Sequence, residues 1–151
     1  MILLPITLTA MGLAALVNIW LSVRIGQVRT REKVSIGDGG NEAVIRRMRA
    51  QANYIENTPF VLGLIAVIEL AKGSGNPSWL FWLMIVYFIA RVLHALGMDE
   101  LKYGRMIGTL VSLLTLAGLG LYALAIPYLA DGQISQPTQV ELQGAEAVPE
   151  S

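Results

Sequence analysis

The chain contains four long apolar stretches separated by short polar segments, and each is close to the length needed to cross a lipid bilayer. The clearest are residues 2–23 and 106–130, which contain 22 and 25 consecutive residues without a charge. A helix rises about 1.5 Å per residue, so about 20 residues cover a hydrocarbon core of about 30 Å. The sequence therefore predicts an all-α integral membrane protein, built as a bundle of four transmembrane helices.

The predicted spans cover approximately residues 2–24, 42–72, 78–98 and 105–130, within a single transmembrane domain of residues 1–130. The second segment is about ten residues longer than one membrane thickness, so its charged end is expected to project into water. The glycine-rich segment 35–41 favours a turn, after which Asn41 can cap a helix that begins at Glu42. Residues 131–151 are polar and acidic, which predicts a disordered tail.

Composition excludes several classes of function. Only 15% of the residues are charged, and 11 Lys and Arg residues against 11 Asp and Glu residues leave no basic field to attract nucleic acid. The absence of cysteine excludes a disulfide, a thiolate metal site and a cysteine nucleophile, and a single histidine cannot make a histidine-rich metal site. We therefore expect no metal and no nucleic-acid partner, and any reactive sulfur must come from a ligand.

The distribution of basic residues predicts how the chain is oriented in the membrane. Seven of the 11 Lys and Arg residues lie between Arg24 and Arg49, and Lys102 and Arg105 follow the third span. The opposite side has only Lys72 and the acidic tail. Because short loops rich in Lys and Arg stay on the cytoplasmic side, both termini are predicted to be non-cytoplasmic.

Polar side chains recur along one face of each of the last three predicted helices. At about 100° per residue, spacings of three, four and seven residues keep side chains on one side of a helix. The residues concerned are Arg46, Arg49, Asn53 and Glu56 on the second helix, Tyr87, Arg91, His94 and Met98 on the third, and Arg105, Thr109 and Ser112 on the fourth. Polar groups at membrane depth are costly and are functional candidates by default. Together the three faces suit a small polyanion.

Ordinary structural roles are the alternative for these residues. Arg91 needs an anion, and a purely structural ion pair with Glu56 would supply one. A lone histidine such as His94 is more often a packing residue than a ligand. Arg46, Arg47 and Arg105 can be ordinary anchors of the helices at the membrane surface. The hydroxyl groups of Thr109 and Ser112 can simply form hydrogen bonds with the backbone of their own helix.

The second helix contains the pattern R-A-x-x-N-x-x-E-x-x-P, which stands here as Arg49, Ala50, Asn53, Glu56 and Pro59. Together with the stretch YFIARVLHALGM at residues 87–98, it resembles the MAPEG family, the membrane-associated proteins in eicosanoid and glutathione metabolism. The resemblance covers roughly residues 2–130. The loop VSIGDGGN at residues 34–41 resembles that of bacterial members.

This resemblance implies a homotrimer in the bacterial inner membrane that binds glutathione, as co-substrate, between neighbouring subunits near the cytoplasmic face. It implies a glutathione-dependent transferase or peroxidase that acts on hydrophobic small molecules from the lipid bilayer. Carried over by position, Arg49, Asn53 and Glu56 would hold the carboxylate and amino groups of glutathione, Gln51 would contribute across the interface, Arg105 would face the thiol, and Arg24 and His94 are further candidates. Arg91 joins this set from the polar face of the third helix.

Two positions depart from the pattern of leukotriene C synthases, which have tyrosine where this chain has Asn57 and Met98. Two hydroxyl contacts to glutathione are therefore missing.

Gln51 and Asn53 point about 160° apart on one helix, so both can serve a site only where a second subunit takes part. Two other interpretations of the chain remain open: a small four-helix transporter in which Glu56 couples protons or cations, and a membrane scaffold without catalysis.

Overall fold

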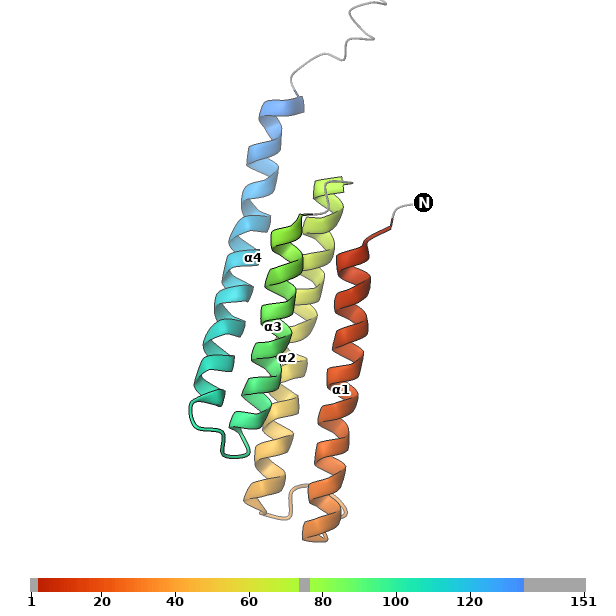
Figure 1. The fold of residues 1–151 in the computed structure, drawn as a ribbon, viewed down its shortest axis with the longest axis vertical. Coiled ribbons are helices and arrows are strands. Elements are labelled where there is room, and N and C mark those ends of the chain that lie inside the picture. Colours follow the sequence, from red (N-terminus) through yellow and green to blue (C-terminus); the bar gives the residue numbers. More distant parts are fainter. Residues whose placement is uncertain (1–2, 74–76, 135–151) are drawn as a thin grey trace, which may run out of the picture.

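The computed structural model describes residues 3–73 and 77–134, which form four long helices (Figure 1). The helices are α1 (Pro5–Glu32), α2 (Glu42–Lys72), α3 (Ser78–Gly97) and α4 (Gly104–Ile134). All four are long and apolar enough to cross a membrane. The prediction of an all-α protein with four candidate membrane spans is therefore confirmed.

Two helices extend beyond their predicted spans. α1 continues from Arg24 to Glu32 because its polar last turns contain no proline, and it ends at Lys33 in the left-handed conformation, with φ of 55°. α4 continues to Ile134, so the first residues of the predicted tail are helical. The remainder of that tail, from residue 135, lies outside the described residues. Asn41 caps α2 as expected, since its side-chain oxygen accepts hydrogen bonds from the backbone N–H groups of Ala43 and Val44.

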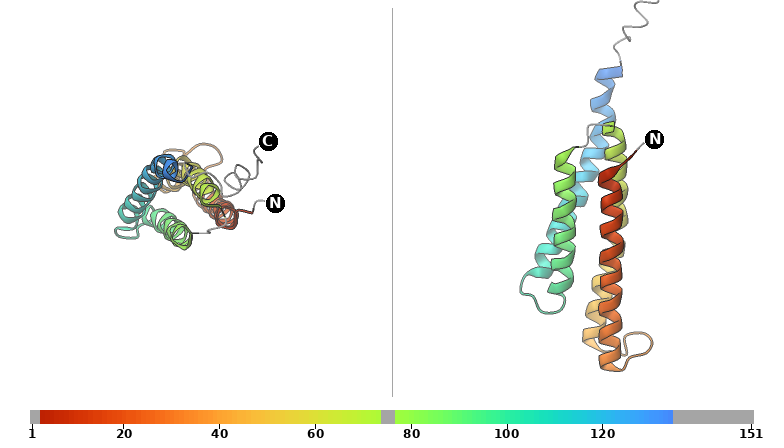
Figure 2. Two further views of the ribbon diagram at one scale, coloured as in Figure 1. Left: turned by 90° about the horizontal axis from the view of Figure 1, so that it is seen from above. Right: turned by 45° about the vertical axis from the view of Figure 1, so that its right-hand side comes forward.

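The four helices form a bundle in which α1 packs on α2 and α3 packs on α4 (Figure 2). α2 also contacts both α3 and α4, whereas α1 and α4 lie on opposite sides of the described bundle and do not touch. The core is made mainly by one side of α2 and α3, with Ile65, Ile68, Leu80 and Met84 fully buried. This arrangement brings the polar faces of α2, α3 and α4 together at the end of the bundle where α3 ends and α4 begins.

Glycines allow α3 and α4 to approach closely at that end. A Cβ atom on Gly108 would lie 2.5 Å from both the carbonyl oxygen of Ala90 and the Cβ of His94. A Cβ atom on Gly97 would lie 2.0 Å from the backbone nitrogen of Arg105. Small residues at such contacts let helix backbones pack directly against each other in membranes. The glycines therefore set the spacing between the third and fourth polar faces.

We expect Gly108→Ala to destabilise the bundle by about 2 kcal/mol, because the added methyl group forces α4 away from backbone atoms of α3 that cannot yield. Gly118→Ala on the same helix is the control, since no atom lies within 4 Å of its Cβ position. This control should be neutral or slightly stabilising, because alanine favours a helix more than glycine does. Thermal unfolding in detergent would contradict the prediction if it gave both variants the same unfolding temperature.

The first turn of α1 is capped by a side chain from α2. Pro5 is the first residue of α1 and has no N–H group, and no side chain of α1 itself caps the helix. Instead, Glu69 accepts hydrogen bonds from the backbone N–H groups of Ile6 (2.9 Å) and Thr7 (2.7 Å) and from the hydroxyl group of Thr7 (2.7 Å). Its side chain is buried. Glu69 thus fixes α1 to α2 at the end of the bundle opposite the polar faces.

Candidate functional site

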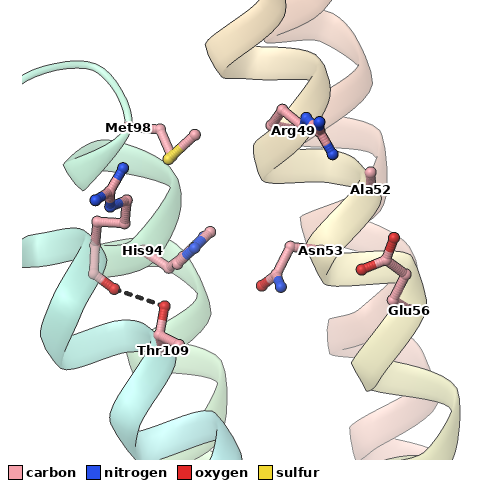
Figure 3. Close-up of a pocket in the computed structure, with 8 residues that line it drawn as sticks. Arg49, Ala52, Asn53, Glu56, His94, Met98 and Thr109 are labelled. Atoms are coloured by element: carbon pink, nitrogen blue, oxygen red, sulfur yellow. Dashed lines mark hydrogen bonds between the residues drawn. The ribbon is translucent and has the colours of Figure 1, made fainter.

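A cavity of about 320 Å³ lies between α2 and the α3–α4 hairpin. Its lining consists of Arg49, Ala52, Asn53 and Glu56 from α2, His94 from α3, Met98 at the C-cap of α3, and Arg105 and Thr109 from α4 (Figure 3). Sites for small molecules usually have volumes of about 300 to 1,000 Å³, so this cavity is large enough for part or all of a small ligand. Five of the residues predicted to bind glutathione therefore meet in one cavity: Arg49, Asn53, Glu56, His94 and Arg105.

The α2 wall of the cavity has one cationic and one anionic side chain. Arg49, Asn53 and Glu56 share a helix face because they are spaced by four and three residues. Ala52 lies on the same face and was not selected from the sequence, although its position three residues after Arg49 indicates its location. Arg49 and Glu56 are exposed, and neither forms an ion pair within the described part of the chain. Both charges are thus available to a ligand.

The α3–α4 wall places His94 opposite Asn53, with the imidazole ring directed into the gap between the helices (Figure 3). His94 is buried, and its Nδ1 atom has no hydrogen-bond partner among the described residues. Thr109 donates a hydrogen bond to the backbone oxygen of Arg105 (2.9 Å), and Ser112 donates one to Gly108 (2.7 Å). The backbone bonding that the sequence offered as the alternative role of these two hydroxyl groups is therefore present, although Ser112 also accepts a hydrogen bond from Arg91.

Met98 and Asn57, the two residues that stand where leukotriene C synthases have tyrosine, lie in different places relative to the cavity. Met98 lines the cavity and gives it a flexible apolar wall. Asn57 donates a hydrogen bond from its side chain to the backbone oxygen of Asn53 (2.8 Å), within its own helix. Asn57 is not among the residues of the cavity lining.

Arg91 lies behind the cavity wall. It is 2% exposed, and its Nη1 and Nη2 atoms donate hydrogen bonds to Ser112 (3.1 Å) and to the side-chain oxygen of Asn53 (2.9 Å). The ion pair between Arg91 and Glu56 considered from the sequence is not formed. Neutral oxygens partner the guanidinium instead, because Asn53 projects between the two helices while Glu56 lies exposed in the cavity lining.

Arg24 does not line this cavity. Its guanidinium pairs with Asp99 in the α3–α4 turn and lies 4.6 Å from the ring centre of Trp20. Arg47 also pairs with Asp99 (2.9 Å) and donates a hydrogen bond to the backbone oxygen of Arg24 (2.7 Å). This cluster joins α1, α2 and the turn that precedes Arg105. Asp99 was not identified from the sequence, since nothing in its local pattern shows that two arginines from other helices reach it.

Gln51 points away from the cavity, as its spacing from Asn53 predicts. Its side-chain nitrogen donates hydrogen bonds to Asn18 (3.2 Å) and Ser22 (2.7 Å) on α1. Asn18 and Ser22 are exposed and Gln51 is half-buried, so three polar side chains gather on the outer face of α1 and α2. Polar groups at membrane depth normally face protein or water and not lipid.

We expect the Arg24–Asp99–Arg47 cluster to lose its stabilising effect in acid. Burial alone would raise the pKa of Asp99, but hydrogen bonds from Arg47 and Arg24 outweigh it and hold this pKa below its ordinary value of 3.8. The folded-state pKa is the lower one, so the contribution is complete above pH 3.8 and is lost as the pH falls through the folded-state value. Asp99→Asn should therefore unfold at a lower temperature than the wild type at pH 7.

The unfolding temperatures of the two proteins should converge once the pH has fallen below the lowered folded-state pKa of Asp99, where the wild-type carboxyl group is also neutral. A difference that stays constant from pH 7 into this range would show that the charge of Asp99 contributes nothing to stability. Glu100→Gln is the matched control, because Glu100 is exposed in the same turn and is absent from the ion pairs of the described residues.

The fold and this cavity together define a multi-pass membrane protein with an arginine-rich cavity at one end of its bundle. The model of the MAPEG family matches residues 7–125 of the chain. The protein therefore belongs to the MAPEG family, which includes glutathione transferases and related enzymes. No curated protein matches the chain.

Proposed function

We propose that the protein is a membrane-embedded, glutathione-dependent transferase or peroxidase that acts on hydrophobic electrophiles. The observation that carries this proposal is the cavity in which Arg49, Asn53 and Glu56 of α2 face His94 and Arg105 of the α3–α4 hairpin. Family membership supports the same class of ligand. The four helices are long and apolar enough to cross a membrane, so apolar substrates would reach the cavity from the bilayer.

The charges near the cavity match glutathione in its thiolate form. Arg49, Arg105 and the buried Arg91 oppose the single carboxylate of Glu56, which leaves a net charge of +2. Glutathione has two carboxylates and one ammonium group, so its net charge is −1 as the thiol and −2 as the thiolate. A site of charge +2 in a poorly hydrated region stabilises the form of charge −2 more strongly. The thiol pKa, about 8.5 in water, should fall on binding.

The proposed roles follow from these charges. Arg49 and the side-chain N–H₂ group of Asn53 bind a carboxylate, and Glu56 accepts hydrogen bonds from the ammonium group. Arg105 stabilises the sulfur anion, and His94 faces the ligand from the α3–α4 wall of the cavity. In a conjugation, the thiolate attacks an electrophilic carbon, a C–S bond forms, and the leaving group departs with its electron pair. Arg24 already has Asp99 as its partner and is not assigned to this site.

We further propose a homotrimer in which the polar outer face formed by Asn18, Ser22 and Gln51 meets a neighbouring subunit. This face is half-exposed at membrane depth in a single chain, where lipid cannot satisfy its hydrogen-bonding groups. Contact with the open side of a neighbour's cavity would bring Gln51 to the bound tripeptide. Native mass spectrometry of the detergent-solubilised protein tests the trimer, and a monomer would contradict it.

The proposed location is the bacterial inner membrane, with both termini non-cytoplasmic and the cavity near the cytoplasmic face. The support is the concentration of Lys and Arg in residues 24–49 and 102–105, at the end of the bundle that holds the cavity.

Glutathione binding by calorimetry, together with conjugation of chlorodinitrobenzene and reduction of an organic hydroperoxide, tests the proposed function. Saturable binding with turnover of either substrate supports it. Failure to bind glutathione would overturn it and would leave the transporter and the scaffold as the remaining interpretations. Binding without any turnover would point to the scaffold.

Glu56→Gln is expected to weaken glutathione binding about tenfold without lowering the unfolding temperature. The carboxylate should accept charge-assisted hydrogen bonds from the ligand's ammonium group, and such bonds contribute about 1.5 to 3 kcal/mol. Stability should not change, because Glu56 is exposed and unpaired within residues 3–73 and 77–134. Calorimetry and thermal unfolding measure the two effects separately.

Glu42→Gln, an exposed carboxylate of α2 outside the cavity lining, provides the control and should bind glutathione like the wild type. Unchanged affinity in Glu56→Gln with a loss of stability in the ligand-free protein would instead assign Glu56 a structural role.

A further inference from the structure

Arg91 has an unusual environment for a charged side chain. It is 2% exposed in the interior of the bundle, and no carboxylate pairs with it among the described residues. Its only hydrogen-bond partners there are the side-chain oxygens of Ser112 and Asn53, and its guanidinium lies 5.7 Å from the ring centre of Tyr54. Burying a cation carries a large desolvation cost, so breaking either of these hydrogen bonds would be strongly unfavourable.

The partner that connects Arg91 to the cavity is Asn53. A guanidinium has only N–H donors, so the group of Asn53 that faces Arg91 must be its oxygen. The hydrogen bond between Arg91 Nη2 and that oxygen is 2.9 Å long. With the oxygen engaged, the N–H₂ group is the part of this amide that remains for the cavity, which Asn53 lines (Figure 3). The amide cannot flip without leaving the Nη2 group of Arg91 without its acceptor.

We propose that Arg91 is a positioning residue that locks the amide of Asn53 in the orientation that offers only donors to the ligand. This inference rests on the proposed function, and it adds a specificity rule to it. The group that binds beside Asn53 must be an acceptor, which in glutathione is a carboxylate or a peptide carbonyl. An ammonium group is rejected at this position and is left to Glu56, so the tripeptide binds in one direction.

A double-mutant cycle tests whether Arg91 acts through Asn53. Arg91→Lys keeps the positive charge but loses the planar fork that reaches two oxygens. In the wild-type background we expect it to weaken glutathione binding about fivefold to tenfold, the effect of one well-oriented hydrogen bond. In the Asn53→Ala background the same substitution should change the Kd less than twofold, because the group it positions is absent. Equal losses in both backgrounds would overturn the proposal, as would no loss in the wild-type background.

Thr58→Val is the matched control for effects on the fold. Thr58 and Tyr87 share a buried hydrogen bond of 2.9 Å between α2 and α3, the same helix pair that Asn53 and Arg91 connect. Thr58→Val should lower the unfolding temperature and leave the Kd for glutathione unchanged. A Kd that rises as much in this control as in Arg91→Lys would mean that any loosening of the two helices weakens binding, and it would overturn the positioning role.

Two further measurements separate this inference from the proposed function. Asn53→Asp should keep or raise the unfolding temperature, since a carboxylate pairs with Arg91, yet should weaken glutathione binding at least tenfold, since it presents acceptors to the ligand's carboxylate. Equal affinity of Asn53→Asp and the wild type would overturn the inference. If the wild type binds no glutathione, the proposed function fails, and the coupling of Arg91→Lys and Asn53→Ala in ligand-free thermal unfolding still decides whether Arg91 holds Asn53.

Discussion

Replacing Arg105 with alanine is expected to lower turnover about a hundredfold while weakening glutathione binding much less. Arg105 is the second residue of α4 and lines the cavity, so the positive N-terminus of the helix adds to its own charge. A shift of the thiol pKa by two units corresponds to about 2.7 kcal/mol, within reach of one close cation at the edge of a poorly hydrated region. Arg49 still holds the carboxylate in the variant, so mainly the charged sulfur loses its partner.

The ultraviolet absorbance of bound thiolate and the pH dependence of turnover measure this effect. The wild type should show the thiolate band near neutral pH, and Arg105→Ala should lack it. Raising the pH towards the ordinary thiol pKa of about 8.5 should restore much of the variant's turnover, because the thiol then ionises unaided. Recovery of turnover at higher pH distinguishes a loss of thiolate stabilisation from a distortion of the cavity, because raising the pH would not restore the shape of the cavity.

Lys102→Ala provides the control for Arg105, since Lys102 is an exposed cation in the turn just before α4 and does not line the cavity. It should leave both the band and the turnover unchanged, and Arg105→Lys should have an intermediate effect. If Arg105→Ala retains the band and full turnover, then Arg105 is only an anchor at the membrane surface, and His94 becomes the candidate for activating the thiol.

Glu69→Ala is expected to lower the free energy of unfolding by an amount on the order of 3 kcal/mol. The substitution leaves three donors without their acceptor: the N–H groups of Ile6 and Thr7 and the hydroxyl group of Thr7. Hydrogen bonds to a charged acceptor are the stronger kind, and buried donors without a partner carry the full cost of lost hydration. Thermal unfolding of the detergent-solubilised protein measures the loss.

Leu70→Ala is the control for Glu69, because the neighbouring Leu70 side chain is 53% exposed and is expected to affect stability little. Glu69→Gln should fall between the wild type and Glu69→Ala, since its amide keeps one acceptor oxygen. Glutathione affinity should change little in all three variants, because Glu69 lies at the opposite end of the bundle from the cavity. An unfolding temperature of Glu69→Ala equal to that of Leu70→Ala would show that the cap contributes nothing.

The sequence alone determined the features that depend on one helix at a time. Stretches of about 20 apolar residues predict membrane spans, because the bilayer thickness fixes the length of helix required. The spacing of Arg49, Asn53 and Glu56 predicts a shared polar face, and the spacing of Gln51 from Asn53 predicts opposite faces, because the rotation per residue is fixed. The cap of Asn41 follows from local backbone geometry in the same way.

Only the tertiary structure decided which side chains of different helices meet. Arg91 contacts Asn53 and not Glu56, Arg24 and Arg47 share Asp99, and Glu69 caps a helix more than sixty residues away in the chain. Each of these contacts depends on the rotation and the axial position of one helix relative to another. Those two quantities are set by packing at the contact surface, as where Gly108 allows α4 to touch α3 directly, and no periodicity within a single helix encodes them.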